Sequence, residues 1–94
     1  MEKINLVFNS VITKEDEIYC SLCLDLNVAS EGETVLESKK NLIEAVNDYI
    51  EIAIENNLPI IRKVGDEDNP LITNPNEVVE QFVIKSDLQI ETYV

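Results

Sequence analysis

The chain has 94 residues and a formal net charge of −12, because 19 Asp and Glu outnumber 7 Lys and Arg. This length suffices for one modest core, so the sequence predicts a single domain over residues 1–94. The acidic charge argues against direct nucleic-acid binding, which normally needs a basic surface, and favours basic partners. The chain has no histidine, which excludes Ser-His and Cys-His nucleophile pairs and histidine metal ligands.

Alternating apolar and polar residues predict two strands joined as a hairpin, over residues 3–13 and 18–26. One face of the first strand carries Ile4, Leu6, Phe8 and Ile12. One face of the second strand carries Ile18, Cys20, Leu22, Leu24 and Leu26. The charged residues 14–17 form the turn between them, and residues 27–31 are expected to form a short third strand.

A long helix is predicted over residues 35–57. Thr34 and Glu37 match a capping box, in which the threonine accepts a hydrogen bond from the glutamate N–H and the carboxylate reaches back. Gly32 is expected to allow the sharp change of direction before the helix. The helix is expected to end at Leu58-Pro59, because a residue before proline avoids the helical region.

At about 100° per residue, this helix has three surfaces. The first apolar stripe consists of Val35, Leu42, Val46, Tyr49 and Ala53. The second apolar stripe, beside it, consists of Leu36, Ile43, Ile50 and Ile54. The acidic ridge on the opposite side consists of Glu37, Glu44, Asp48, Glu51 and Glu55. The acidic ridge is expected to be exposed and is a candidate partner-binding surface. The second stripe is a candidate oligomer interface, although an ordinary core would explain both stripes.

The remainder of the chain predicts a connection and a last strand. Residues 59–74 contain a glycine, two prolines and an acidic triplet, which are typical of an exposed connection. Asn74 as N-cap and Pro75 at the first helical position predict a short helix through residues 78–81. The last strand is predicted over residues 81–94.

These elements predict an α+β fold of the order β-β-β-α-β, with one long helix packed on a four-stranded mixed sheet. A helix that joins the third strand to the last as a right-handed crossover makes those two strands parallel. The long first and last strands are then expected to be parallel neighbours at the centre of the sheet.

Two groups of residues could carry chemistry. Cys20 and Cys23 match C-x-x-C, but in an extended strand they point to opposite faces and cannot bind one metal ion. Asp25 with Glu31 or Glu33 could form a metal-dependent catalytic site, although nothing in the sequence brings these acids together. The two glutamates also make the loop around Gly32 a poor phosphate site. We therefore expect no catalytic residue, no cofactor, no metal site and no enzymatic activity.

The sequence G-E-T at residues 32–34, followed within the predicted helix by N-L-I-E-A at residues 41–45, forms a combined pattern. With the Leu58-Pro59 exit, it resembles the HicB-like antitoxin domain of toxin-antitoxin systems over about residues 1–61. The matching positions are Gly32, Thr34, Asn41, Leu42, Glu44, Ala45 and Tyr49. The chain departs from the family at Leu24, where a proline is usual, and at Ser38-Lys39, where a Glu-Ala pair is usual.

The resemblance implies a domain that binds and neutralises a small basic toxin of the HicA type, an mRNA-cleaving ribonuclease with a double-stranded-RNA-binding fold. Because no DNA-binding segment follows the last predicted strand, we expect a single-domain form. The alternative is a stand-alone homo-oligomeric binding or assembly module, a homodimer or larger, with no toxin partner. Two cysteines without an export signal or a long apolar run predict a cytoplasmic protein with no contact to membranes.

Overall fold

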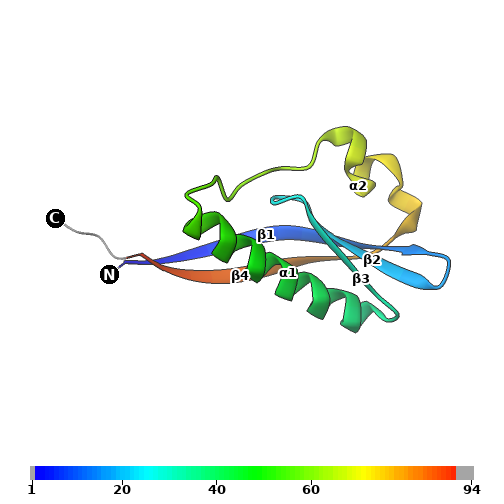
Figure 1. Cartoon of the computed structure of the whole chain (residues 1–94). Helices are drawn as coiled ribbons and strands as arrows, with labels where there is room; N and C mark the ends of the chain where they lie inside the picture. Colours follow the sequence, from blue (N-terminus) through cyan, green and yellow to red (C-terminus); the bar gives the residue numbers. More distant parts are fainter. Residues whose placement is uncertain (1, 91–94) are drawn as a thin grey trace.

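The computed structural model describes the backbone of residues 2–90 and the side chains of residues 6–86. Three strands come first, namely β1 (Glu2–Glu15), β2 (Ile18–Cys23) and β3 (Val28–Gly32). The long helix α1 (Val35–Glu55) follows, then the short helix α2 (Pro70–Thr73), and then β4 (Val78–Ile90) (Figure 1). The α+β class and the β-β-β-α-β order predicted from the sequence are confirmed.

The sheet has the strand order β3-β2-β1-β4, and every neighbouring pair is antiparallel. β1 and β4 are neighbours, as predicted, and β1 is central. The predicted mixed sheet is nevertheless wrong, since β4 is an edge strand that runs antiparallel to both β1 and β3. After α1 the chain runs back along the sheet before β4 begins (Figure 1). Val78 consequently starts opposite Thr13, at the hairpin end of β1.

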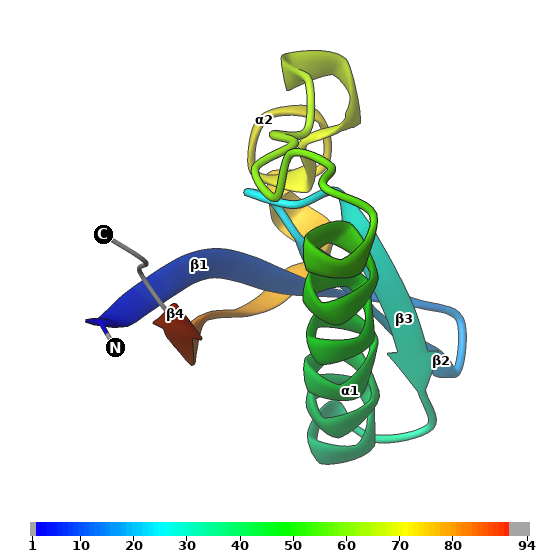
Figure 2. The ribbon, with the colours of Figure 1, turned by 60° about the vertical axis from the view of Figure 1, so that its left-hand side comes forward.

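One end of the sheet contains only two strands. Residues 2–9 of β1 pair in the sheet with β4 but not with β2, which pairs with residues 10–15. Figure 2 shows this two-stranded ribbon extending away from α1. The molecule is accordingly elongated, with principal extents of 53 × 26 × 20 Å.

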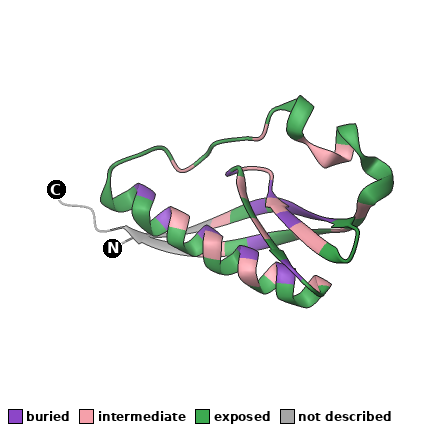
Figure 3. Cartoon of the chain, turned by 45° about the vertical axis from the view of Figure 1, so that its right-hand side comes forward, coloured by how far each residue is buried: buried purple, intermediate pink, exposed green. Residues whose placement is uncertain are grey.

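The core lies between α1 and one face of the sheet (Figure 3). Its buried members are Phe8, Cys23, Leu26, Leu42, Val46, Ile50 and Ile84. Ser21 of β2 also faces α1, because its hydroxyl donates to the backbone carbonyl of Ser38 at 3.1 Å. The first apolar stripe of α1 thus packs on the sheet, with Leu42, Val46 and Ala53 buried.

The prediction that Ile18, Cys20, Leu22, Leu24 and Leu26 share one face is wrong for Leu26, which belongs to the core. β2 ends at Cys23, and the turn that follows places Asn27 at a φ of 56°. This turn carries Leu26 back to the α1 side, while Cys20 and Leu22 stay on the face away from α1, called here the outer face.

The start of α1 is capped as predicted, with one difference. Thr34 Oγ1 accepts a hydrogen bond from the Glu37 N–H at 3.0 Å. Glu37 Oε1 accepts from the N–H of Glu33 at 3.2 Å, one residue earlier than the capping box predicts. Both bonds satisfy donors at the helix entrance.

The end of α1 is set by hydrogen bonds rather than by the proline at position 59. The Leu58 N–H donates to the Ala53 carbonyl at 2.8 Å, and the Asn57 N–H donates to the Ile54 carbonyl at 3.2 Å. Asn57 has a φ of 54°. These features form a Schellman motif, which ends the helix two residues before the predicted boundary.

The extra helix lies earlier than predicted. α2 covers Pro70–Thr73, where Asn69 Oδ1 accepts from the Leu71 N–H at 3.0 Å. Pro75–Glu77 form a single 3-10 turn that begins, as predicted, after Asn74 with Pro75 at its first position. Residues 78–81 belong to β4, so the predicted continuation of the helix through 78–81 is wrong. Pairing with β1 satisfies the backbone of these residues. The predicted strand residues 91–94 lie outside the described residues.

Candidate partner-binding surfaces

The acidic ridge lies on the exposed side of α1. All five of its residues, Glu37, Glu44, Asp48, Glu51 and Glu55, are exposed. Within the part of the chain that the structure describes, the single ion pair joins Lys39 to Glu80, so no ridge carboxylate is held in an ion pair. The ridge is therefore a solvated negative surface, except that Glu37 also caps α1.

The second apolar stripe does not form one continuous surface. Leu36, Ile43 and Ile54 are 71%, 40% and 54% exposed, whereas Ile50 is 3% exposed and packs in the core. Ile50 is therefore not available to a second chain, and its place in the predicted oligomer interface is wrong. The other three residues remain accessible.

The acids considered for metal binding are not brought together. Asp25 lies in the turn before β3, where its Oδ2 accepts from the Asn9 N–H at 2.7 Å. Glu31 and Glu33 lie at the other end of β3. Among residues whose side chains are described, no group of three or more His, Cys, Asp or Glu could hold a metal ion.

The two cysteines point to opposite faces, as predicted, and neither forms a disulfide. Cys23 is buried in the core, and its burial raises the pKa of the thiol. Cys20 lies on the outer face, where burial, and then the carboxylates of Glu15 and Glu31, raise its pKa. Both groups consequently favour the neutral thiol, which is the less nucleophilic form.

The segment after α1 is attached by contacts that no local sequence pattern reveals. The Tyr49 hydroxyl, within the first stripe, donates to the carbonyl of Ile60 at 2.9 Å. Further along, the Arg62 and Val64 N–H groups donate to the carbonyls of Asp25 and Leu24, each at 2.9 Å. These bonds direct the connection across the turn between β2 and β3 and bring α2 over the outer face.

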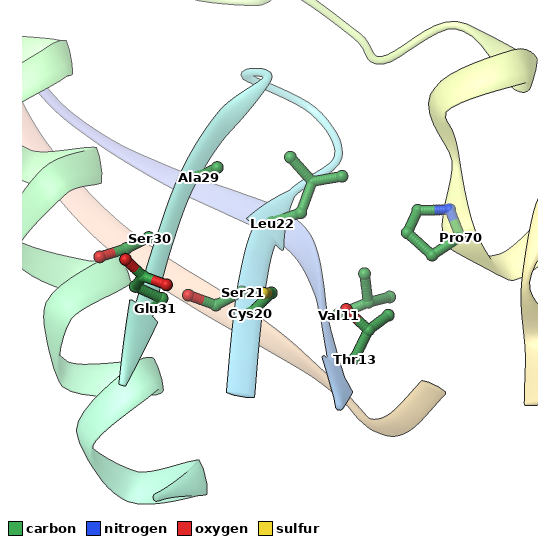
Figure 4. Close-up of a pocket in the computed structure, with 9 residues that line it drawn as sticks. All are labelled: Val11, Thr13, Cys20, Ser21, Leu22, Ala29, Ser30, Glu31 and Pro70. Atoms are coloured by element: carbon green, nitrogen blue, oxygen red, sulfur yellow. The ribbon is translucent and has the colours of Figure 1, made fainter. Parts of the chain in front are cut away.

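A recess of about 430 Å³ lies between α2 and the outer face (Figure 4). Its floor consists of two rows of cross-strand neighbours. The rows are Val11–Leu22–Ala29 and Thr13–Cys20–Glu31. Pro70 lies across from Val11 and Leu22 and forms the opposite wall. The sequence did not predict this recess, because only the return path of residues 59–77 creates the second wall.

The fold and these surfaces define a small acidic α+β domain with exposed faces, whose described side chains include no group that could hold a metal ion. Within the described residues, no helix is long and apolar enough to cross a membrane.

A solved structure with a similar fold is the N-terminal domain of the antitoxin HicB from Burkholderia pseudomallei. The likeness covers 93% of this chain and all of that one, at 22% identity and a TM-score of 0.57. At this identity the comparison shows that the folds are alike, which supports the HicB-like fold predicted from the G-E-T and N-L-I-E-A pattern. No protein-family model matches the sequence, and none of the curated proteins compared with it is similar.

Proposed function

We propose that this chain is an antitoxin-like domain that binds a small basic toxin of the HicA type and covers its RNA-binding face. The observation that carries the proposal is the fold shared with the N-terminal domain of HicB over 93% of the chain. The protein acts by binding and not by catalysis. Its cellular site of action is the cytoplasm, where such a ribonuclease would meet mRNA.

The charge distribution supports this proposal. The acidic ridge presents four carboxylates that do not cap the helix, at Glu44, Asp48, Glu51 and Glu55. Complementary charge accelerates encounter with a basic surface and competes with phosphate for it. Each exposed ion pair contributes only about 0.2–1 kcal/mol, so several ridge residues must act together.

The test uses a purified candidate toxin, a small basic protein encoded beside this chain. The unaltered chain in excess should abolish cleavage of a model mRNA, and raising NaCl should weaken the complex. The triple variant Glu44→Lys/Asp48→Lys/Glu51→Lys should weaken inhibition at least roughly tenfold, through loss of favourable pairing and new repulsion.

The matched control is Asp66→Lys/Glu67→Lys/Asp68→Lys, which makes the same change in charge on an exposed 3-10 turn away from α1. This control should inhibit like the unaltered chain. Full ribonuclease activity in the presence of excess unaltered chain would rule out the proposed function for that toxin. Equal loss in both variants would rule out the ridge as the contact surface.

The alternative function is a homo-oligomeric assembly module, favoured by the exposure of Leu36, Ile43 and Ile54 on one side of α1. The variant Ile43→Lys/Ile54→Lys should then convert an oligomer into a folded monomer, measured by light scattering after size-exclusion chromatography. Ile72→Lys, at an exposed residue of α2, is the control. An oligomer that survives the double substitution excludes this surface.

A further inference from the structure

We propose that the recess on the outer face binds one apolar side chain of a basic partner segment, whose Lys or Arg residues contact the acids at the open end of the recess. The inference deepens the proposed function, since it names a second contact surface on the side of the sheet opposite α1. Its geometry, however, does not depend on the identity of the toxin.

The recess is apolar where it is deepest. Val11 and Thr13 of β1 are buried, Cys20 and Leu22 of β2 are partly buried, and Ala29 of β3 is exposed. The outer face is thus covered near β1 and progressively uncovered toward the edge strand β3. A volume of about 430 Å³ bounded by Val11, Leu22 and Pro70 has room for an aliphatic side chain.

The open end of the recess continues into an acidic surface. Glu31 lines both the recess and a neighbouring depression of about 220 Å³ that Glu33 and Glu37 also line. Ile18 and Glu33 connect that depression to a wider one containing Asp16 and Glu17. A single surface therefore passes from apolar side chains to the carboxylates of Asp16, Glu17, Glu31 and Glu33, and it ends at Glu37, which caps α1.

Among the side chains of residues 6–86, no basic group forms an ion pair with these carboxylates. The one ion pair among the described side chains is Lys39 with Glu80, on the α1 side. Lys14, the basic residue closest in sequence to the hairpin, lies over the ring of Tyr19 at 5.6 Å from the centroid. Burial of an apolar anchor provides affinity, and the flanking acids select basic neighbours.

This arrangement argues against a second copy of the chain as the occupant. Each copy carries a net charge of −12, so two copies repel each other at this acidic surface. A basic segment instead gains both the apolar contact and opposite charge, and we therefore assign the recess to such a segment.

The probe is a nine-residue peptide with leucine at its centre and lysines on both sides, followed by amide shifts of the ¹⁵N-labelled chain. We expect shifts at residues 20–22 and 29–33. Replacing the central leucine by serine should weaken binding at least roughly tenfold, because the apolar contact is lost. Shifts confined to α1, or equal affinity for both peptides, would overturn the inference, as would peptide-independent shifts at residues 20–33 that grow with protein concentration.

Two substitutions test the site in the protein itself. Ala29→Phe places a ring in the recess from an exposed position of an edge strand, and should lower peptide affinity at least roughly tenfold. Val7→Phe is the matched control, since Val7 is exposed on β1 outside the recess, and should bind normally. Unchanged affinity in a folded Ala29→Phe protein contradicts the inference, and the mapping on the unaltered chain decides the matter if that variant does not fold.

The proposed antitoxin function and the proposed recess site can be refuted independently of each other. Peptide binding in the recess without inhibition of any toxin would refute the proposed function and retain the recess. Toxin inhibition that Ala29→Phe and Glu31→Lys both leave unchanged would retain the function and refute the recess as its contact surface.

Discussion

Gly32 shows how a single residue sets the junction between sheet and helix. The sequence suggested that glycine allows an unusual backbone angle, but Gly32 does not have a positive φ. Glycine is needed at position 32 because no larger residue fits there. An added Cβ would lie 2.6 Å from the backbone N of Ser38 and 2.9 Å from the carbonyl carbon of Glu37. β3 can thereby approach the first turn of α1, which positions Thr34 and Glu37 to cap the helix.

Gly32→Ala should therefore lower the free energy of unfolding by about 1–3 kcal/mol, the usual cost of overpacking. Urea denaturation followed by circular dichroism measures it. Gly65→Ala is the control, since the nearest atom to its added Cβ is 3.7 Å away and its φ is −68°. That substitution should be neutral or stabilise the protein by up to about 1 kcal/mol. Equal losses for both glycines would contradict the packing explanation.

The cysteines should differ in reactivity and respond to pH. Their raised pKa values keep both as thiols at neutral pH, so Cys20 should react with a disulfide reagent more slowly than a small free thiol. Cys23 should react only on unfolding, because it is buried. The substitution Glu31→Gln should accelerate the reaction of Cys20 with the reagent, because it removes a carboxylate that raises the pKa of the Cys20 thiol. Two native thiols with the same rate would refute this assignment.

The raised pKa values of the two thiols also predict how the stability of the fold changes at alkaline pH. A thiol whose pKa is higher in the folded state stabilises the fold at pH values below its unfolded pKa of about 8.5. That contribution decreases as the pH rises above this value. The folded protein should accordingly lose stability above about pH 8.5, and less so in a Cys23→Ala variant, as measured by urea denaturation at several pH values.

Hydrogen bonds set both ends of α1. The sequence predicted the N-terminal end of this helix better than the C-terminal end. The T-x-x-E pattern made the N-terminal cap predictable at Thr34. At the other end, Asn57 adopts the left-handed conformation that completes the Schellman motif. The sequence had instead predicted that Pro59 ends the helix. Asparagine tolerates this conformation but does not require it, so its role depends on the observed backbone angle.

Asn57→Ala should destabilise the protein by about 1–2 kcal/mol, because alanine in the left-handed region places its Cβ too close to a carbonyl. Asn57→Gly should preserve or slightly increase stability, since glycine adopts this conformation freely. Thermal unfolding of both variants provides the measurement. If alanine and glycine behave alike, the left-handed cap does not limit stability.

At the scale of the whole molecule, the dominant feature is the net charge of −12 on an elongated domain. Like charges repel within the folded chain, and salt screens that repulsion. The free energy of unfolding should therefore increase between 10 and 500 mM NaCl. In the triple variant of the acidic ridge, each substitution changes the charge by +2 and the net charge becomes −6, so the increase should be smaller. If salt increases the free energy of unfolding equally in the unaltered chain and in the triple variant, repulsion between like charges is not the cause.

The sequence by itself determined the order of the elements, the extent of α1 to within two residues, its N-terminal cap and the opposite orientation of the two cysteines. These features depend on local periodicity and on neighbours within a few residues, which are visible in one chain. The acidic ridge was visible for the same reason. Its role in partner binding stays a prediction.

Tertiary structure alone decided the direction of β4, the face on which Cys20 and Leu22 lie, and the existence of the recess. Val11 and Ile12 are adjacent, point to opposite faces and are both buried, so the alternation in β1 did not show which face meets α1. The return path depends on bonds between distant residues, from Tyr49 to Ile60 and from Val64 to Leu24. Such pairings depend on which segments meet in space, and no local pattern records them.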